Sequence, residues 1–260
     1  MRIISFCADS IVDAAKRGFF DWVTKQDADI ICIQNLGIAE YKLRDDVYFP
    51  RDYNPYFFDA ADGKHNGVAI YCRKLPKAIM TGLGFLDFDM DGLYIQADFD
   101  NISIGSLLAP TAEEGDSAGL IRKNQFFEQF GNHLTKVRNK RRDFIICGNW
   151  NIAHRGIDIQ DIRGNHGKPG SLAEEQQWMD RLFREQQYSD AFRLINNDPN
   201  EFSWWPDGEP GTNGWRVDYQ ITSEHMTPRV AYGAIYNVQP FGKHAPLIMD
   251  YYSELPASPF

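Results

Sequence analysis

The chain has 260 residues, of which 43% are hydrophobic and 24% charged, and its formal net charge is −9. This acidic balance argues against a protein that coats nucleic acid by bulk charge attraction, but it leaves room for a local basic patch. No apolar stretch approaches the ~20 residues needed to span a bilayer, and the N-terminus lacks the apolar core of a signal peptide, so we expect a cytoplasmic protein. Since no linker rich in Ser, Gly or Pro interrupts the chain, we expect a single domain over residues 1–260.

The first half of the chain predicts strands with few helices between them. Strand-like apolar runs occupy residues 2–7, 28–34, 67–72, 94–99 and 102–108. The last two runs are joined through Asp100 and Asn101 as a predicted hairpin. Residues 11–25 are compatible with a helix that is interrupted near Gly18, and residues 35–54 read as a polar loop.

The second half contains longer helical patterns. From Leu120 the apolar spacing becomes helical, and this helix ends in the basic run 136–142. A second helix is predicted over residues 174–184. Short strands are predicted at residues 202–205, 215–221 and 245–251. Many short strands with a few helices between them indicate two packed sheets flanked by helices.

An apolar strand beginning at Ile145 ends at Gly148 and delivers two carboxamides, Asn149 and Asn151. Because a glycine backbone can turn sharply where a strand ends, we expect both carboxamides to lie in any site at that edge of the sheet. Four cysteines lie in or beside apolar strand patterns without CxxC spacing: Cys7, Cys32, Cys72 and Cys147. Buried, reduced thiols are therefore favoured over metal ligands or disulfides.

Seven segments resemble, in order along the chain, the exonuclease III and abasic-site endonuclease branch of the endonuclease/exonuclease/phosphatase superfamily. They are residues 2–7 (RIISFC), 29–35 (DIICIQN), 66–71 (NGVAIY), 94–99 (YIQADF), 147–154 (CGNWNIAH), 214–220 (GWRVDYQ) and 244–248 (HAPLI). The resemblance implies an α/β fold, a four-layered α/β sandwich in which two packed mixed sheets are flanked by helices. Its members cleave phosphodiesters with Mg²⁺, which needs hard oxygen ligands, while an acidic residue activates water.

The residues that carry this chemistry in the family are only partly present here. The family's Asn, metal-binding Glu, Tyr, nucleophile-activating Asp and C-terminal Asp are replaced, in that order, by Cys7, Asn35, Leu108, Asn149 and Lys243. The retained positions are Asn151, Asp218 and His244. An amide cannot accept a proton near neutral pH, and three lost carboxylates remove the charge that would hold Mg²⁺. We therefore expect no catalytic residue, no metal and no cofactor, with Mg²⁺ only if the nuclease alternative holds.

The pair Asp218 and His244 has two interpretations. The aspartate could orient an imidazole that binds phosphate, or the two side chains could form an inherited hydrogen bond that ties two strands together. We favour the structural interpretation.

Among members stripped of acidic ligands, the chain looks most like the catabolite repression control proteins, on residues 76–85, the basic run before Asp143, and residues 202–206. That resemblance implies a translational co-repressor that docks with an Hfq-like RNA chaperone on A-rich mRNA and does no chemistry. The alternative is a Mg²⁺-dependent exodeoxyribonuclease III or abasic-site endonuclease with an atypical or weak site in DNA repair. A protein-only scaffold is a third possibility.

The basic run is the predicted RNA or partner surface. It places five cations in seven residues, which exceeds what the helix dipole needs: Lys136, Arg138, Lys140, Arg141 and Arg142. Lys77 and Arg229 are added to this surface only because they resemble basic positions of the repressor proteins.

Overall fold

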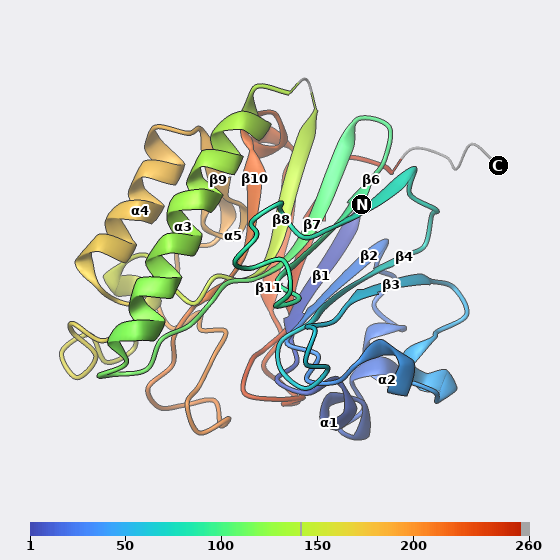
Figure 1. The fold of residues 1–260 in the computed structure, drawn as a ribbon, viewed down its shortest axis with the longest axis horizontal. Coiled ribbons are helices and arrows are strands. Elements are labelled where there is room, and N and C mark those ends of the chain that lie inside the picture. The colour runs from blue at the N-terminus through green and yellow to red at the C-terminus, as the bar shows by residue number, and fades with distance from the viewer. Residues whose placement is uncertain (141, 256–260) are drawn as a thin grey trace.

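The computed structural model describes residues 1–140 and 142–255, and they form two six-stranded sheets packed face to face. In Figure 1 two long helices cover one side of the sheet pair, and two short helices lie at the opposite side. These layers confirm the predicted four-layered α/β sandwich.

The first sheet has the strand order β11-β12-β1-β2-β4-β3. Its strands are β1 (Arg2–Cys7), β2 (Ile30–Gln34), β3 (Asn54–Phe58), β4 (Val68–Cys72), β11 (Val230–Ile235) and β12 (Leu247–Tyr251). The β1–β2 pair is parallel and the other pairs are antiparallel. A parallel pair places both carboxyl ends at one edge of the sheet.

The second sheet has the strand order β5-β6-β7-β8-β10-β9. Its strands are β5 (Ala78–Thr81), β6 (Tyr94–Asp98), β7 (Ile102–Leu108), β8 (Asp143–Asn149), β9 (Tyr188–Asp190) and β10 (Asp218–Ser223). Strands β7 and β8 are parallel, whereas β10 runs antiparallel to β8. The predicted hairpin between β6 and β7 is confirmed.

The α-helices are α1 (Ile11–Lys16), α2 (Phe19–Val23), α3 (Ser117–Arg138), α4 (Ala173–Arg184) and α5 (Ala191–Ile195). The predicted interruption near Gly18 is confirmed, since Gly18 adopts a φ of +85° between α1 and α2. Helix α3 starts earlier than the apolar spacing indicated, because the Asp116 side chain caps it by accepting from the backbone N–H of Gly119 at 2.9 Å. Short 3₁₀ helices are η1 (Glu40–Lys42), η2 (Asp46–Tyr48), η3 (Gly156–Asp158) and η4 (Glu224–Arg229).

Alternation of side chains along β1 divides the apolar residues between two cores. Ile3 and Cys7 face the second sheet, whereas Ile4 and Phe6 pack with α1 and α2. Both faces of the strand are buried, which explains why the sequence shows a continuous apolar run rather than alternation.

The structure differs from the sequence prediction at several short strands. Strands β3, β5, β9 and β11 were not predicted. The strand predicted at residues 215–221 begins only at Asp218, as β10. The strand predicted at residues 202–205 forms only isolated bridges, of Trp204 with Trp215 and with His244, and Trp215 also bridges to Ile159. Strand β3 begins Asn-Pro and is half-buried throughout, so it lacks the apolar run that identifies the central strands. Within the described ranges no helix is long and apolar enough to cross a membrane.

Candidate functional site

Strand ends from both sheets bring polar side chains together at one edge of the sandwich. In the second sheet, Leu108 at the end of β7 pairs with Asn149 at the end of β8, and Asn149 pairs with Asp218 at the start of β10. In the first sheet, Cys7 ends β1 beside Gln34, the last residue of β2. The register therefore places Asn149 between Leu108 and Asp218, as neighbours on adjacent strands.

Left-handed residues follow three of these strands. Asp9, Asn35 and Asn151 come one or two residues after β1, β2 and β8 and have φ values of 57°, 56° and 53°. Asn and Asp tolerate this conformation better than other residues with a Cβ, because their short polar side chains can bond locally. The same left-handed turn thus follows β1, β2 and β8, and it places an amide or a carboxylate residue at each of these three strand ends.

Gly148 is required for the approach of β7 to β8. Its φ is +146°, and a Cβ built on it would lie 1.9 Å from the carbonyl oxygen of Leu107. Any side chain would separate the strands just before Asn149. The glycine that ends the apolar run in the sequence is therefore the residue that allows the site's central strand to pair.

His244 and Asp218 form the predicted hydrogen bond. Nδ1 of His244 lies 2.8 Å from Oδ2 of Asp218, which also accepts from the Ser203 hydroxyl at 2.7 Å, and all three side chains are buried. Burial by itself lowers the pKa of His244, but Asp218 and Cys7 outweigh it and hold that pKa well above its ordinary value. The bond fixes the ring so that Nε2 faces Asp9, with its Oδ1 at 4.0 Å.

A cluster of three possible metal ligands lies around Nε2 of His244. Donor atoms of Cys7, Asp9 and His244 all lie within 4.8 Å of one another. Burial raises the pKa of the Cys7 thiol, and His244 opposes that shift. Asp9 was missed from the sequence, where its only signal is its position two residues beyond the end of β1.

Carboxamides face two members of this cluster. Nδ2 of Asn149 donates to Sγ of Cys7 at 3.6 Å, and Nδ2 of Asn35 donates to Oδ1 of Asp9 at 3.3 Å. Asn149 also accepts the backbone N–H of Asn151 at 2.9 Å through Oδ1. Asn151 in turn donates Nδ2 to the carbonyl oxygen of Ala109 at 2.7 Å. The expected grouping of Asn149 and Asn151 at the sheet edge is present.

The donor set around His244 does not fit Mg²⁺, the ion that the resemblance implies. Mg²⁺ takes oxygen ligands in near-octahedral geometry, whereas the cluster offers a thiol, an imidazole and a single carboxylate. Asp218, the nearest further carboxylate, uses Oδ2 for His244 and Ser203. No reaction step is therefore assigned to Mg²⁺.

Two further replaced positions also lie at this edge. Leu108 is buried in the core between the sheets and offers no polar atom. Lys243 is exposed next to His244, and its carbonyl oxygen accepts from the backbone N–H of Trp205 at 3.1 Å. The cation therefore stands at the rim of the site and not within the cluster.

A pocket of about 460 Å³ adjoins this edge. It is shared by the long loop after β8 and the segments around Trp204 and Trp215, and Asn151 and Lys168 contribute to its wall. Trp204 lines this pocket while Trp205 is 4% exposed in the core, which agrees with the expectation that at least one of the two is a core residue.

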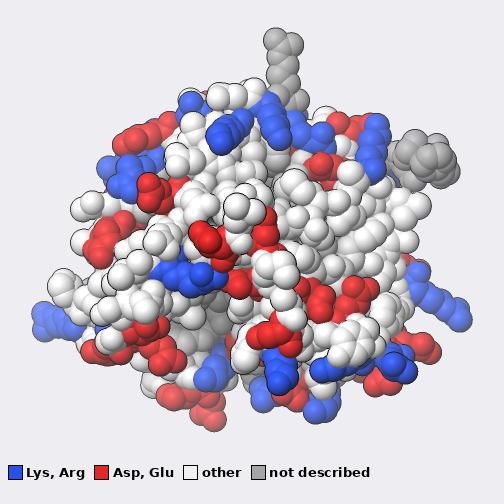
Figure 2. Space-filling view, in the orientation of Figure 1, with Lys and Arg blue, Asp and Glu red and all other residues white. Residues whose placement is uncertain are grey.

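The predicted basic surface lies at the other end of β8. Lys136, Arg138 and Lys140 are exposed just before this strand, whereas Asn149 ends it, about 20 Å away at roughly 3.3 Å per residue. In Figure 2 several Lys and Arg side chains lie along the upper rim, and side chains of both signs are spread over the rest of this face. The basic run and the candidate site therefore occupy opposite ends of the sheet.

Four residues assigned to the basic surface are engaged in contacts within the fold. Arg138 donates Nη1 to the carbonyl oxygen of Glu185 at 2.9 Å. Arg142 donates to the Ser103 hydroxyl at 2.6 Å and to the carbonyl oxygen of Ile102 at 3.1 Å. Arg229 pairs with Asp143 at 3.1 Å, and Lys77 pairs with Asp100. Arg141 lies outside the described residues.

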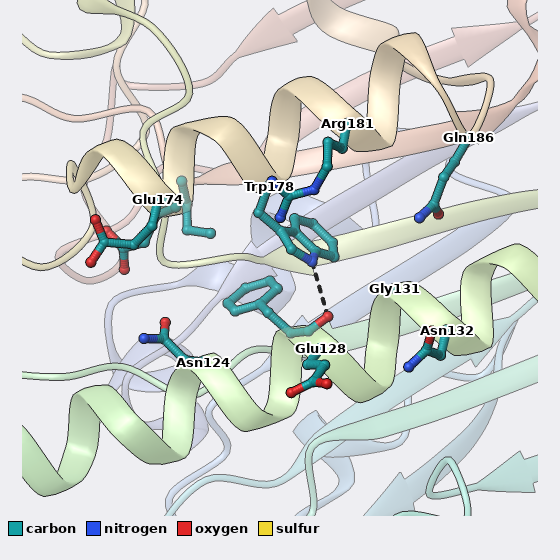
Figure 3. A pocket seen from close by; sticks show the side chains of 11 residues that line it. Asn124, Glu128, Gly131, Asn132, Glu174, Trp178, Arg181 and Gln186 are labelled. Atoms are coloured by element: carbon teal, nitrogen blue, oxygen red, sulfur yellow. Dashed lines mark hydrogen bonds between the residues drawn. The ribbon is translucent and has the colours of Figure 1, made fainter.

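A second cavity, of about 340 Å³, lies between α3 and α4 (Figure 3). Trp178 reaches across it from α4 and donates Nε1 to the carbonyl oxygen of Phe127 at 3.0 Å. Asn124, Glu128 and Arg181 also line it, but the cluster around His244 does not. This groove is a helix–helix contact with a polar rim, separate from the candidate site.

Comparisons with known proteins agree with this architecture. Residues 11–237 match the Endonuclease/Exonuclease/phosphatase family. The chain is 28% identical to the DNA repair nuclease APEX1 of Danio rerio over 96% of its own length and 81% of that protein. It is 27% identical to an exodeoxyribonuclease of Bacillus subtilis over 88% and 91%. An AP endonuclease structure from Archaeoglobus fulgidus superimposes with a TM-score of 0.86 at 20% identity, covering 97% and 100% of the two chains.

These findings correct one prediction. The expectation that the chain is not an enzyme is wrong, because the relatives that match it over most of their length are nucleases. The prediction of an inactive protein rested on Asn35, Asn149 and Lys243. It assumed that each replaced carboxylate removes a catalytic role. In the structure two of these side chains make specific contacts with the cluster instead. The chain belongs to the endonuclease/exonuclease/phosphatase family, in its exonuclease III and abasic-site endonuclease branch.

Proposed function

We propose that this protein is a metal-dependent phosphodiesterase that acts on DNA, as an abasic-site endonuclease or 3′-exonuclease in DNA repair. The single observation that carries the proposal is the Asp218–His244 pair at the meeting edge of the two sheets, with Asn149 and Asn151 beside it. Relatives named DNA repair nuclease and exodeoxyribonuclease support DNA as the substrate class.

The chain's own residues supply binding and orientation at this edge. Asp218 holds the imidazole of His244 in one orientation, which directs Nε2 toward the open side of the cluster, where Asp9 is exposed. Lys243, exposed beside His244, is placed to contact a backbone phosphate. The pocket walled by Asn151 and Trp204 offers space for the sugar or base next to the scissile bond.

The direct test is a nicking assay on a duplex that carries one abasic site, together with a 3′-end digestion assay. Each divalent ion, Mg²⁺, Mn²⁺, Zn²⁺ and Co²⁺, is supplied separately to protein that has been freed of metal. We expect turnover with at least one ion and a loss of ~10²-fold or more in His244→Ala. Absence of turnover with every ion and both substrates would refute the proposal.

A matched control separates chemistry from the loss of any histidine. His225 is exposed in η4, which follows the far end of β10, so His225→Ala should keep the wild-type rate. If His225→Ala and His244→Ala lost the same activity, the assignment of the site to this edge would be wrong.

Binding to an Hfq-like RNA chaperone and A-rich mRNA remains a prediction that rests on the sequence resemblance. The exposed part of the basic run is the surface that would serve them. Because this surface lies at the opposite end of β8 from the candidate site, RNA or partner binding there would leave the cluster around His244 accessible.

A further inference from the structure

Three side chains at the sheet edge, Cys7, Asp9 and His244, form a donor set that differs from the oxygen ligands of Mg²⁺. We propose that these three residues bind one Zn²⁺ ion. The inference deepens the proposed function by naming the metal of the same site, and it rests on that function only for the role of the ion, since binding is measured without DNA.

The geometry of the cluster suits a small ion with mixed donors. The donor atoms lie within 4.8 Å of one another, and Nε2 of His244 is 4.0 Å from Oδ1 of Asp9. In a tetrahedral zinc site with bonds of about 2.0–2.3 Å, donors lie about 3.3–3.6 Å apart. Closing around an ion therefore needs side-chain movement on the order of 1 Å. Asp9 is exposed and can make that movement without disturbing the core.

The donor types select the metal. Thiolate and imidazole are ligands of Zn²⁺ and related transition ions, whereas Mg²⁺ and Ca²⁺ take oxygen. One carboxylate, one imidazole and one thiolate leave the fourth position of a tetrahedral ion for water or a phosphate oxygen, as in catalytic zinc sites. A site of this composition would discriminate strongly against Mg²⁺.

Each ligand has an outer partner that orients it. Asp218 accepts from Nδ1 of His244, so the nitrogen left for a metal is Nε2. Asn149 donates to the Cys7 sulfur, and Asn35 donates to Asp9. A carboxylate at either Asn position would set two negative groups against each other. The two amides, which donate N–H groups, therefore suit a Cys7 thiolate and an Asp9 carboxylate that both bind a cation.

Asp218 keeps one oxygen free of partners among the described residues. Its Oδ1 is buried and accepts no hydrogen bond from any of them, while Oδ2 lies 2.8 Å from Nδ1 of His244. The carboxylate charge behind the ring makes the imidazole a better ligand for a metal ion at Nε2, as in other carboxylate–histidine–zinc sites.

The test uses Co²⁺ as a spectroscopic probe on the full chain after removal of metal by a chelator. We expect one Co²⁺ per chain, with the intense visible absorption of tetrahedral cobalt and a near-ultraviolet thiolate-to-cobalt band. Zn²⁺ should displace the ion, and a large excess of Mg²⁺ should not. An octahedral spectrum without a thiolate band, or displacement by Mg²⁺, would overturn the proposal.

Variants assign the ligands. Cys7→Ala should remove the thiolate band, and Cys72→Ala, a change of another buried thiol at the far end of β4, should keep it. Because Cys7→Ala alters the core, Asp9→Asn serves as the second variant: Asn keeps the shape and tolerates the left-handed backbone of Asp9, and it should weaken Co²⁺ binding at least tenfold. Equal binding by the wild type and both ligand variants would refute the site.

The two proposals fail separately. If the protein binds Co²⁺ through Cys7 but cleaves no DNA with any ion, the metal site is supported and the proposed function is refuted. If the protein cleaves DNA with Mg²⁺ but shows no cobalt–thiolate band, the proposed function is supported and the zinc site is refuted.

Discussion

The side-chain amide of Asn149 lies 3.6 Å from the sulfur of Cys7 and directs an N–H at it. The other end of the same amide accepts the backbone N–H of Asn151 at 2.9 Å, which fixes the orientation of the group. An aspartate at position 149 would place an oxygen against the sulfur instead. Two departures from the family pattern, 142 residues apart in the sequence, are thus complementary in space.

This complementarity predicts coupling between positions 7 and 149. In chelator, Asn149→Asp should lower the free energy of unfolding by about 1–3 kcal/mol, because a buried carboxylate loses the donor role of the amide. Adding Cys7→Asn, which can donate to the new carboxylate, should recover part of that loss. Denaturant unfolding of the two single variants and the double variant should give a coupling of at least about 0.5 kcal/mol.

The control cycle pairs Asn149→Asp with Cys72→Ser. Cys72 is also a buried thiol, but it pairs with Ile30 at the start of β2, away from the site. These two changes should add independently. Additive energies for positions 7 and 149 as well would show that the Asn149–Cys7 contact does not contribute.

The sequence predicted the fold better than the chemistry. Buried strands such as β2 and β8 appear as apolar runs, because both faces are covered, and the order of the motifs identified the family. Asp9 was missed because its role depends on a left-handed turn and on a partner, His244, that is remote in sequence. Asn35 was interpreted as a lost ligand, because its contact with Asp9 cannot be predicted from the amino-acid sequence alone.

Gly148 should be indispensable for the second sheet. Gly148→Ala should cost at least about 3 kcal/mol of unfolding free energy, because the Cβ would collide with the backbone of Leu107 and no side chain suits the φ of +146°. Gly115→Ala is the control: its φ is +85°, but nothing lies within 4 Å of the new Cβ, so the loss should be about 1 kcal/mol. Equal losses in thermal or denaturant unfolding would show that the clash is relieved by movement of β7.

Asp158 should make stability depend on acid pH. Asp158 is the buried last residue of η3, and its Oδ1 accepts from Arg216 and Arg193, each at 2.8 Å. Burial raises the pKa of Asp158, but the two guanidinium groups outweigh it and lower the pKa to about 2. The folded value is below the unfolded value, so the carboxylate contributes about 2 kcal/mol that is fully present above the unfolded pKa near 4. That contribution is lost as the pH falls through about 2.

Asp158→Asn isolates this effect. The variant should be less stable near neutral pH by about 3–5 kcal/mol, because two buried guanidinium groups lose their shared carboxylate. Its unfolding free energy should also fall less steeply between pH 4 and pH 2 than that of the wild type. The same acid slope in both proteins would assign the pH dependence to other carboxylates.

The exposed part of the basic run should act on nucleic-acid affinity and not on the fold. Lys136 and Lys140 are exposed at the end of α3, so Lys136→Gln with Lys140→Gln should leave the melting temperature unchanged. If both lysines contact phosphates of an A-rich RNA, the slope of log K against log salt should fall by about 1.4, at roughly 0.7 per phosphate of a single strand. Fluorescence anisotropy of a labelled RNA over a salt series measures this slope.

Arg142 supplies the contrast within the same run. Its guanidinium donates to Ser103 and to the carbonyl oxygen of Ile102, so Arg142→Gln should lower the unfolding free energy by about 1–3 kcal/mol, because buried acceptors lose their donor. It should change the salt slope little, since these hydrogen bonds hold the guanidinium against the β6–β7 hairpin. If Arg142→Gln changed the slope of log K against log salt strongly and the double lysine variant did not, the nucleic-acid surface would lie on the β6–β7 hairpin and not at the exposed end of α3.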